Sequence, residues 1–585
     1  MNTTNLTLRK SGLLPLHSFT KLLTVFFCLA TLLLPATAAD LQLLINEAIR
    51  RGEKKIVLPP GEHRLAKGLQ LKGLSGVTLD GTGATLIFTN LLDGGILAQD
   101  CTELVLRGFT IDFDPLPFTQ GTVEKVDPVT CEVTFTVHDG YRDLEPLFLK
   151  GRAHVFSPKT LSWKTDAPDL YATEAKALTP RQGVLRFAKE KREEFSSISP
   201  GDYLALDFRN SRGIRIQRSQ GVRLENLTFW SAPSIAVVCR YMDGENFFRY
   251  KIERGPLPPG ATIPRLLSTS ADGLNYAYAR TGAIIDNCDF SFMADDGVNL
   301  HGIAFYVAKV EGNTLYLLRP YPAEGFDSVI KPGDEVLGLD SNSFDVKGRG
   351  KVTQFTVKPH TPDEYMKQAA QIWKSSSVVT GKVTVYQLDL AAPLGIKAGD
   401  FLEIPAIAGP NYIIRNSRFH DHRGRGLRLM SSSGLVENNI IENTKQSGIS
   451  IGPEFTFARE AGWVHDVIIR NNTVSRCSFD PCMQRAGVYA PGAISIFHRG
   501  ETPSAPLPEM RQQKIVIEKN RIEESGGPAI HINQSRDVKV TGNTIRKANL
   551  KSRPGAGSTY KLTTDKPINV DNSTDVVIDP DQIVP

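Results

Sequence analysis

The sequence predicts an all-β protein, a right-handed parallel β-helix into which two small antiparallel β-barrel domains are inserted. Three observations support this fold class. A short phrase recurs at a spacing near 22 residues, a length typical of one coil of a β-helix. Two long gaps interrupt the recurrence and carry strand patterns of their own. Helical periodicity is nearly absent from the 585 residues.

The recurring phrase is about six residues long, begins and ends with an apolar residue, and often holds Asn or Gly. Consecutive copies begin at 414 and 436, and at 517 and 540, so these spacings are 22 and 23 residues. A coil of this length forms about three short strands, and successive coils stack about 4.8 Å apart as parallel sheets. Asn suits the corners because it tolerates left-handed backbone and can stack. The copies are LRGFTI, LENLTF, IDNCDF, IIRNSRF, VENNII, IRNNTV, IEKNRI and VTGNTI.

Two gaps in the recurrence, 111–224 and 290–414, are too long for loops. The first contains VEKVDPVTCEVTFTV and the second FYVAKVEGNTLYLLRP, and both alternate like strands around tight turns. We therefore expect two small barrels that support the coil or shape its surface. The predicted organisation is a signal peptide (1–38), an N-terminal cap with the first coils (39–113), a first barrel (114–209), central coils (210–302), a second barrel (303–409), C-terminal coils (410–560) and a tail (561–585).

The N-terminal residues have the pattern of a secretory signal. Lys21 precedes the apolar run LLTVFFCLATLLLP, and Ala36-Thr37-Ala38 matches the A-x-A motif of a cleavage site. We expect cleavage after Ala38 or Ala39 and export to the periplasm or the medium, with an uncleaved anchor as the alternative. The segment that follows, LQLLINEAIRR at 41–51, has helical spacing and is predicted to cap the open end of the coil.

The charge balance argues against a polyanionic partner. Three of the 68 basic residues lie in the signal segment, which has no Asp or Glu, so 65 remain against 63 acidic residues. This balance gives no reason to expect nucleic acid as a partner. Of the seven cysteines, Cys28 leaves with the signal, and the others are too scattered for a disulfide framework or a zinc site. Cys477 and Cys482 could close a small loop or stay unpaired.

Three aspartates stand out because their spacing equals one coil. Asp272, in TSADGLNY, precedes Asp295 in FMADDGVNLHG by 23 residues, and Asp296 follows directly. If no loop intervenes, Asp272 and Asp295 occupy the same position on adjacent coils, about 4.8 Å apart along the axis. Carboxylates this close cannot all ionise freely, so at least one pKa should rise. Such a cluster predicts general acid and base catalysis, in which one carboxyl protonates a glycosidic oxygen and another activates water.

Two other interpretations of the aspartates remain open. A calcium site would need more clustered oxygen ligands, as in D-x-D-x-D-G. A plain ladder of corner residues would need no chemistry at all. Beyond Gly297, alternation places Asn299 and His301 on one face of a strand, where they can line the same cleft, whereas Val298 and Leu300 face the core.

These residues resemble a known family. RLLSTSADGLNY (265–276), IDNCDF (285–290) and ADDGVNLHG (294–302) are similar to the central motifs of glycoside hydrolase family 110. The resemblance implies a pectin-lyase-like β-helix with two inserted barrels and an exported bacterial α-1,3-galactosidase. Its implied reaction is inverting hydrolysis of terminal α-1,3-linked galactose, including that of blood-group B glycans, without a cofactor. The three active-site aspartates of the family match Asp272, Asp295 and Asp296, whereas Asn275 stands where the family usually carries His.

Roles follow from this resemblance as expectations. Asp295 is expected to be the general acid, and Asp272 and Asp296 to hold and deprotonate the attacking water. The acid and base carboxyls should then lie about 6.5–9.5 Å apart. Trp463 could stack on a sugar or pack in the core. The candidates for contacts with the carbohydrate substrate are Arg240, Arg265, Asn275, Asn299, His301, Glu454 and Glu460.

Three alternatives are kept at this stage. A polygalacturonase-like hydrolase of family 28 is also an inverting β-helix enzyme with three aspartates, but its Gly-His-Gly and Arg-Ile-Lys motifs are missing here. A non-catalytic β-helix that only binds glycans would show no turnover. A polysaccharide lyase would need calcium or a basic catalytic residue.

Overall fold

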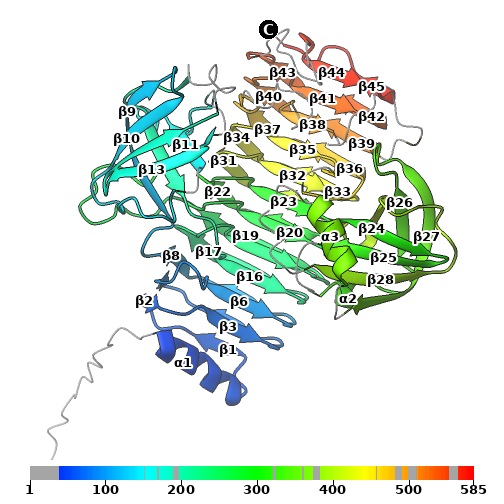
Figure 1. Cartoon of the computed structure of the whole chain (residues 1–585), viewed down its shortest axis with the longest axis horizontal. Helices are drawn as coiled ribbons and strands as arrows, with labels where there is room; N and C mark the ends of the chain where they lie inside the picture. Colours follow the sequence, from blue (N-terminus) through cyan, green and yellow to red (C-terminus); the bar gives the residue numbers. More distant parts are fainter. Residues whose placement is uncertain are drawn as a thin grey trace, which may run out of the picture. The chain divides into compact units, whose positions relative to one another are not determined.

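The computed structural model describes the chain from Ala38 to Val584 with gaps. The described residues are 38–149, 152–165, 167, 170–188, 197–319, 325–358, 362–372, 383–455, 458–480, 491–497, 509, 512–551 and 564–584. They form a parallel β-helix with two inserts, one on each side of the coil in Figure 1. The predicted signal segment at 1–37 and Cys482 lie outside the described residues.

One long sheet of eleven parallel strands runs the length of the coil, with each strand contributed by a different coil. Its members, in spatial order, are β3 (Leu69–Lys72), β6 (Ile96–Gln99), β16 (Ile214–Gln217), β18 (Val237–Arg240), β20 (Leu274–Ala277), β23 (Val298–His301), β32 (Leu427–Met430), β35 (Ile449–Ile451), β38 (Ile494–Ile496), β41 (Ile530–Asn533) and β44 (Ile568–Asp571).

The rest of the coil belongs to a bent sheet of 21 parallel strands. These are β1 (Lys55–Val57), β2 (Gly61–Leu65), β4 (Thr78–Asp80), β5 (Ala84–Phe88), β7 (Val105–Arg107), β8 (Thr110–Phe113), β17 (Arg223–Phe229), β19 (Asn246–Ile252), β21 (Ala283–Asp286), β22 (Asp289–Ser291), β30 (Ile413–Arg415), β31 (Arg418–His422), β33 (Gly434–Glu437), β34 (Ile440–Thr444), β36 (His465–Arg470), β37 (Thr473–Ser475), β39 (Gln512–Glu518), β40 (Arg521–Glu523), β42 (Ser535–Thr541), β43 (Thr544–Arg546) and β45 (Thr574–Ile578).

Alternating side chains fill the interior of the coil. In β20 and β23 the inward residues Leu274, Tyr276, Val298 and Leu300 are fully buried in one continuous core that extends through the other coils. Residues between them face outward, as the two-residue period of a strand requires. The outer face of the eleven-stranded sheet is therefore free to carry polar side chains.

Asparagines at the corners form the ladder that the sequence predicts. Corner residues such as Asn438 and Asn471 have positive φ angles of 56° and 55°. The next residue in each coil points inward: Asn439 Nδ2 donates to Asn472 Oδ1, and Asn472 Nδ2 donates to Asn520 Oδ1, each at 3.0 Å. The ladder continues through Asn543 to Gln582. It joins the C-terminal coils through buried hydrogen bonds.

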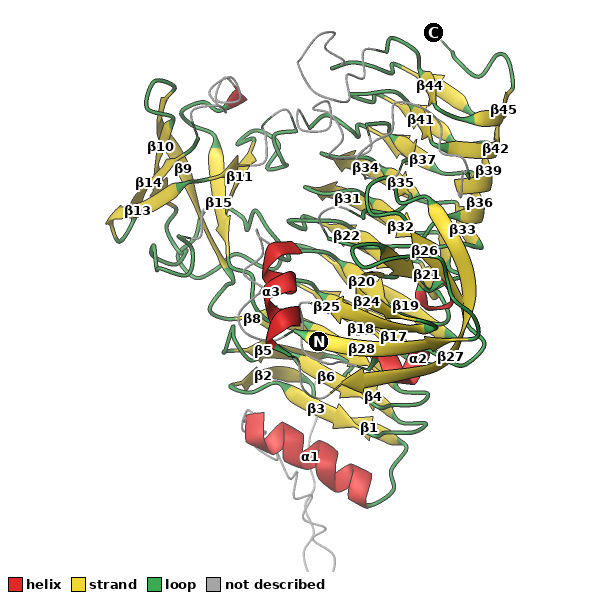
Figure 2. Cartoon of the chain, turned by 45° about the vertical axis from the view of Figure 1, so that its right-hand side comes forward, coloured by secondary structure: helices red, strands yellow, loops and turns green. Residues whose placement is uncertain are grey.

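The helix α1 (Ala38–Arg50) covers the N-terminal end of the coil, as predicted for 41–51. Leu41, Ile45 and Ala48 are buried in the continuous core, and Gln42 Nε2 donates to the Gln70 carbonyl oxygen. Figure 2 shows α1 lying across the first strands. Among the described residues, no helix is both long enough and apolar enough to cross a membrane.

The two inserts differ in how their strands close. The second forms a closed antiparallel barrel in the order β24-β25-β28-β27-β26-β29. The first is a seven-stranded sheet in the order β12-β11-β15-β9-β10-β14-β13, and no pairing of described residues joins its two edges. This differs from the predicted barrel, because turn and strand patterns do not show whether a sheet closes. The elements are β9 (Phe118–Asp127), β10 (Glu132–Val137), β11 (Arg152–Phe156), β12 (Leu170–Tyr171), β13 (Glu174–Thr179), β14 (Gln182–Arg186) and β15 (Tyr203–Asp207), then β24 (Ala304–Glu311), β25 (Thr314–Arg319), α2 (Phe326–Val329), β26 (Glu335–Leu339), β27 (Val346–Lys358), α3 (Asp363–Ile372), β28 (Thr384–Leu390), β29 (Phe401–Glu403) and a 3-10 turn (Pro405–Ile407).

Two further details differ from the predictions. The predicted tail at 561–585 holds β44 and β45, which pair with β41 and β42 as another coil. The coil that contains the aspartates is 24 residues long, because Leu274 pairs with Val298 on the next coil. Asp272 therefore aligns with Asp296 and not with Asp295. Spacing alone missed this, because one additional residue in a bend does not alter the recurring phrase.

The asparagine ladder gives a test of what holds the C-terminal coils together. The Asn472 side chain accepts two hydrogen bonds and donates two. Asn472→Ala leaves their buried partners unsatisfied, and each such group lowers the free energy of unfolding by about 1–3 kcal/mol. We expect a clearly lower unfolding temperature by calorimetry. The exposed Lys539→Ala is the control and should leave it unchanged. Equal unfolding temperatures for the two variants would contradict a supporting role for the ladder.

Candidate active site

The three aspartates meet at the entrances of two neighbouring strands. Asp272 precedes β20, and Asp295 and Asp296 precede β23. One carboxylate oxygen from each lies within 4.8 Å of the other two. Asp272 and Asp296 are buried, whereas the Asp295 side chain keeps 23% of its surface exposed. The site is thus a compact cluster of carboxyl groups with one member facing solvent.

Close stacking of the backbone explains why glycine follows Asp272 and Asp296. The amide N–H of Gly273 donates to the Asp296 carbonyl oxygen at 2.9 Å. A Cβ at Gly273 would lie 2.7 Å from the Gly297 carbonyl oxygen, and a Cβ at Gly297 would come still closer to that of Gly426. Only glycine lets adjacent coils stack in this way, and the stacking brings the acidic side chains together.

Arg425 neutralises and fixes Asp296. Its Nε donates to Oδ1 at 3.0 Å and its Nη2 to Oδ2 at 2.7 Å, and its backbone N–H also donates to Oδ1 at 2.7 Å. Bidentate pairing of this kind holds a carboxylate in one orientation. Both oxygens of Asp296 are therefore occupied by the next coil.

Two further arginines hold Asp295. Arg209 Nη1 donates to Oδ2 at 2.8 Å, and Arg423 Nη1 lies 3.1 Å from Oδ1. Burial by itself would raise the pKa of Asp295, but the guanidinium groups of Arg423 and Arg209 outweigh it and hold the pKa well below its usual range. Asp295 is therefore the ionised, partly exposed carboxylate of the cluster. The positive charge that a metal ion would bring to the three carboxyls is already supplied by arginines.

Asp272 is the carboxyl of the cluster whose pKa is raised. Burial, reinforced by the negative charges of Asp295 and Asp296, raises its pKa to about 8. Asn275 Nδ2 donates to Oδ2 at 2.8 Å and only partly opposes this. At neutral pH Asp272 keeps its proton, as an acid catalyst requires. This differs from the expectation that Asp295 is the acid, because the sequence did not show where the arginines lie.

The spacing also differs from the expectation. Oxygens of the three carboxyls lie within 4.8 Å of one another, whereas the predicted acid and base groups were about 6.5–9.5 Å apart. The shorter spacing follows from direct stacking of Asp272 on Asp296 across one coil.

Outward residues of the next strands continue the site along the sheet. Asn275 pairs with Asn299, and Asn299 pairs with Arg428, on three adjacent strands. Glu460 lies over this row, with Oε2 3.3 Å from Arg428 Nε and Oε1 3.7 Å from His301 Nε2. Burial lowers the pKa of His301 to about 4, so its imidazole is neutral at pH 7.

Two oxygens in this row are buried without a partner. Asn275 Oδ1 and Asn299 Oδ1 accept no hydrogen bond among the described residues, although both side chains are about 5% exposed. Buried polar atoms are nearly always satisfied in native proteins, and those that are not often await a ligand or water. These amide oxygens can accept hydrogen bonds from hydroxyl groups of a bound sugar.

The other predicted contact residues have structural partners. Arg265 forms a buried bidentate pair with Asp112 at 2.9 Å, so both of its terminal nitrogens are already engaged. Glu454 accepts a hydrogen bond from the Ala458 amide and closes the loop that carries Glu460. Arg240 donates to the carbonyl oxygens of Cys239 and Asn275 and lies over the Tyr278 ring.

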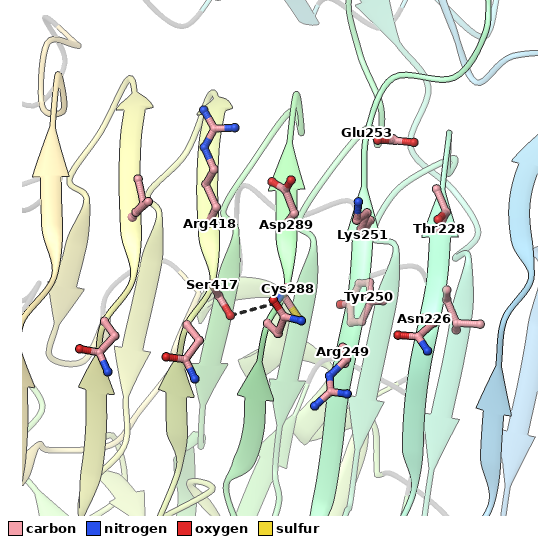
Figure 3. Close-up of a pocket in the computed structure, with 15 residues that line it drawn as sticks. Asn226, Thr228, Arg249, Tyr250, Lys251, Glu253, Cys288, Asp289, Ser417 and Arg418 are labelled. Atoms are coloured by element: carbon pink, nitrogen blue, oxygen red, sulfur yellow. Dashed lines mark hydrogen bonds between the residues drawn. The ribbon is translucent and has the colours of Figure 1, made fainter.

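Trp463 and a separate cavity have no part in the cluster. Trp463 packs in a buried aromatic cluster with Phe344, Phe401 and Phe455. A separate polar cavity of about 580 Å³ lies on the bent sheet, along the corners of β17, β19, β22 and β31. Figure 3 shows its lining, including Lys251, Asp289 and Arg418, and none of the predicted site residues belongs to it.

Sequence comparison finds similar proteins. The family model for a right-handed β-helix region matches residues 402–576. The α-1,3-galactosidase A of Bacteroides thetaiotaomicron is 26% identical over 437 residues, with 71% of each chain covered. The α-1,3-galactosidase A of Bacteroides fragilis strain YCH46 is 23% identical, over 86% of this chain and 84% of that protein. The chain is a relative of the α-1,3-galactosidases.

Two solved structures are similar to this chain at low identity and low TM-score. The tailspike protein of Escherichia coli bacteriophage HK620 shares 11% identity with a TM-score of 0.40, over 93% of this chain and 62% of that one. The A-module of a mannuronan C-5 epimerase from Azotobacter vinelandii shares 12% identity with a TM-score of 0.34, over 94% and 95%. The curated galactosidase relatives confirm both the resemblance to family 110 and the prediction of a glycoside hydrolase.

The arginines that pair with the carboxyls are far from the aspartates in the sequence of this galactosidase relative. Arg423, Arg425 and Arg428 lie 127 or more residues after Asp296, because the second insert separates consecutive coils. One signal could have found them: GLRLM at 426–430 has the same pattern as GVNLH at 297–301 and aligns with it across the insert. No comparable repeat marks Arg209, which follows the first insert.

The raised pKa of Asp272 has a consequence for stability. The pKa of Asp272 is 3.8 in the unfolded chain and about 8 in the folded protein, so at pH values between them only the folded protein keeps the proton. This contribution to stability is present in full below about pH 4 and is lost as the pH rises toward 8. Asp272→Asn, which has the shape of the protonated acid, removes the loss. We expect the variant to unfold at a higher temperature than wild type at pH 8, with a much smaller difference near pH 4.5.

The matched control is Asp243→Asn, which removes an exposed carboxylate 3.3 Å from Lys331. It should show no such pH-dependent gain. A gain for Asp272→Asn of the same size at both pH values would contradict the protonation of Asp272.

Proposed function

We propose that the protein is an exported hydrolase that removes terminal α-1,3-linked galactose from glycans, including blood-group-B-like galactosides, with inversion at the anomeric carbon. One observation carries the proposal. A buried carboxyl that keeps its proton lies beside an ionised, solvent-facing carboxylate, in a relative of α-1,3-galactosidases. These are the two protonation states that acid and base catalysis of glycoside hydrolysis needs.

The proposed roles follow the protonation states. Asp272 donates its proton to the glycosidic oxygen as the bond to the anomeric carbon breaks. Asp295 accepts a proton from the water that attacks this carbon. Asp296, paired with Arg425, supplies part of the field that raises the pKa of Asp272. After the product leaves, Asp295 releases its proton to solvent and Asp272 takes one up.

The carboxyl oxygens lie within 4.8 Å of one another, a spacing nearer to that of retaining enzymes, and inversion is proposed against it because of how the carboxylates are held. A retaining mechanism needs a carboxylate oxygen that is free to attack the anomeric carbon. Both oxygens of Asp295 face guanidinium groups, and both oxygens of Asp296 accept hydrogen bonds from Arg425. A proton can still be received at a remaining lone pair, whereas attack on carbon would require breaking an ion pair.

The galactose site is proposed along the outer row of the eleven-stranded sheet. Asn275 and Asn299 each offer an unpartnered amide oxygen to a sugar hydroxyl. Neutral His301 donates from Nδ1 to the Gly302 carbonyl oxygen, so its Nε2 is an acceptor, and ionised Glu460 offers a further acceptor. A neutral hexose suits this set, because the charged groups of the row already pair with one another.

A proton NMR time course on galactosyl-α-1,3-galactose tests the function. We expect the wild type to release β-galactose first, and to act far more slowly on the α-1,4- and α-1,6-linked disaccharides. Chelator should leave the rate unchanged. Asp243→Asn is the matched control and should retain full activity. First release of α-galactose would overturn inversion, and glycan binding without any turnover would overturn the hydrolase.

The two proposed roles can be separated by the leaving group. A 4-nitrophenyl galactoside needs little acid assistance, so Asp272→Asn should lose roughly 10³-fold on the disaccharide but far less on the nitrophenyl substrate. Asp295→Asn should lose activity on both. With the wild type, kcat/KM on the disaccharide should fall as the pH rises through about 8, where Asp272 loses its proton. The reverse pattern of the two variants would restore Asp295 as the acid.

A further inference from the structure

The first insert ends directly against the catalytic cluster. Its last strand, β15, finishes at Asp207, and Arg209 follows two residues later. Arg209 Nη1 donates to Asp295 Oδ2 at 2.8 Å, and its Nη2 donates to the Ala294 carbonyl oxygen at 2.8 Å. Its Nε donates to Asp207 Oδ2 at 3.1 Å. The guanidinium is thus fixed on three sides, with one side against the proposed base.

Asp207 is itself held by the insert. It is buried, Arg152 Nη1 lies 3.4 Å from its Oδ2, and His154 Nε2 lies 3.4 Å from its Oδ1. Burial would raise the pKa of Asp207, but His154, Arg152 and Arg209 act against it and hold the pKa below its usual range. Arg152 and His154 both belong to β11. A chain of contacts therefore leads from the insert through Asp207 and Arg209 to Asp295.

This chain is not needed to attach the insert. Ser162 Oγ and Trp163 Nε1 donate to Asp421 on the coil, each at 3.0 Å. Gln120 Nε2 donates to the Pro264 carbonyl oxygen, and its Oε1 accepts from the Leu266 amide. With these attachments elsewhere, the contact of Arg209 with Asp295 can serve the site and not the docking of the insert.

We propose that Arg209, oriented by Asp207, is a positioning residue that holds the Asp295 carboxylate for proton acceptance, so that the first insert completes the active site. This inference rests on the proposed function, in which Asp295 is the base. The charged groups that face Asp295 are Arg209, Arg423 and Arg152 on the positive side and Asp296 on the negative side, whereas Asp272 keeps its proton at neutral pH. Removing Arg209 leaves the negative Asp296 and a weaker positive set.

The test uses Arg209→Gln, Arg209→Lys and Asp207→Asn in the full-length enzyme. For Arg209→Gln we expect kcat on the disaccharide to fall roughly 10- to 100-fold with little change in KM. The acidic limb of the kcat/KM profile should move up by about one pH unit or more, since an opposite charge lowers a carboxyl pKa by about 1–3 units. Arg209→Lys should restore part of the rate, and Asp207→Asn should shift the limb in the same direction by less.

The matched control is Arg218→Gln, which breaks a similar pair with Asp100 on the outer coil. It should change neither rate nor profile. A fall in rate with an unmoved acidic limb in all three site variants would mean a purely structural role and would overturn the inference. If Arg209→Gln does not fold, the acidic limb of the kcat/KM profile is measured for Arg209→Lys and Asp207→Asn instead, and an unmoved limb in both overturns the inference.

A measurement without substrate separates this inference from the proposed function. Protein labelled with carbon-13 at the aspartate carboxyls is titrated, and the Asp295 signal is assigned by its loss in Asp295→Asn. Its pKa should be higher in Arg209→Gln than in wild type. If that shift occurs but wild type hydrolyses no galactoside, the proposed function fails and the control of Asp295 by Arg209 stands. If wild type is active and the signal does not shift, the inference fails alone.

Discussion

Stacking of one coil on the next brings carboxyl groups together, and the other residues of the site reduce the repulsion between them. Asp272 and Asp296 are forced into register because Gly273 and Gly297 let the backbones stack at the strand entrances. Three carboxyls within 4.8 Å would repel one another strongly in a buried site. The protein relieves this by pairing two of them with arginines and by leaving a proton on the third.

The arginines come from parts of the chain that only the fold brings near. Arg425 and Arg423 enter from the next coil, which follows after the whole second insert. Arg209 enters from the end of the first insert. The packing is similarly divided: Leu266, Leu267 and Ala294 pack against the first insert, and Ala277, Tyr278 and Ile303 against the second. Both inserts thus pack against residues next to the two strands that follow the aspartates.

The division of roles among the carboxyls is an electrostatic outcome. Asp272 and Asp295 have the same side chain and lie in the same cluster, but their pKa values move in opposite directions. Asp295 is ionised because guanidinium groups face both of its oxygens. Asp272 keeps a proton because the side chain is buried, two carboxylates are near, and the Asn275 amide only partly offsets them. Environment, and not residue type, assigns acid and base.

The sequence by itself determined the coil, its asparagine ladder, the N-terminal helix, the two inserts and the three aspartates, because these depend on local periodicity and short spacing. It placed Asn275, Asn299, His301 and Glu460 near one another, whereas Arg265 pairs with the distant Asp112 and Glu454 accepts a hydrogen bond within its own loop. Only the tertiary structure decided the 24-residue register, the open first sheet, the final coil at β44 and β45, and which carboxyl keeps its proton. The physical reason is that charge interactions depend on distance in space, and the inserts separate in sequence the very arginines that stacking brings together.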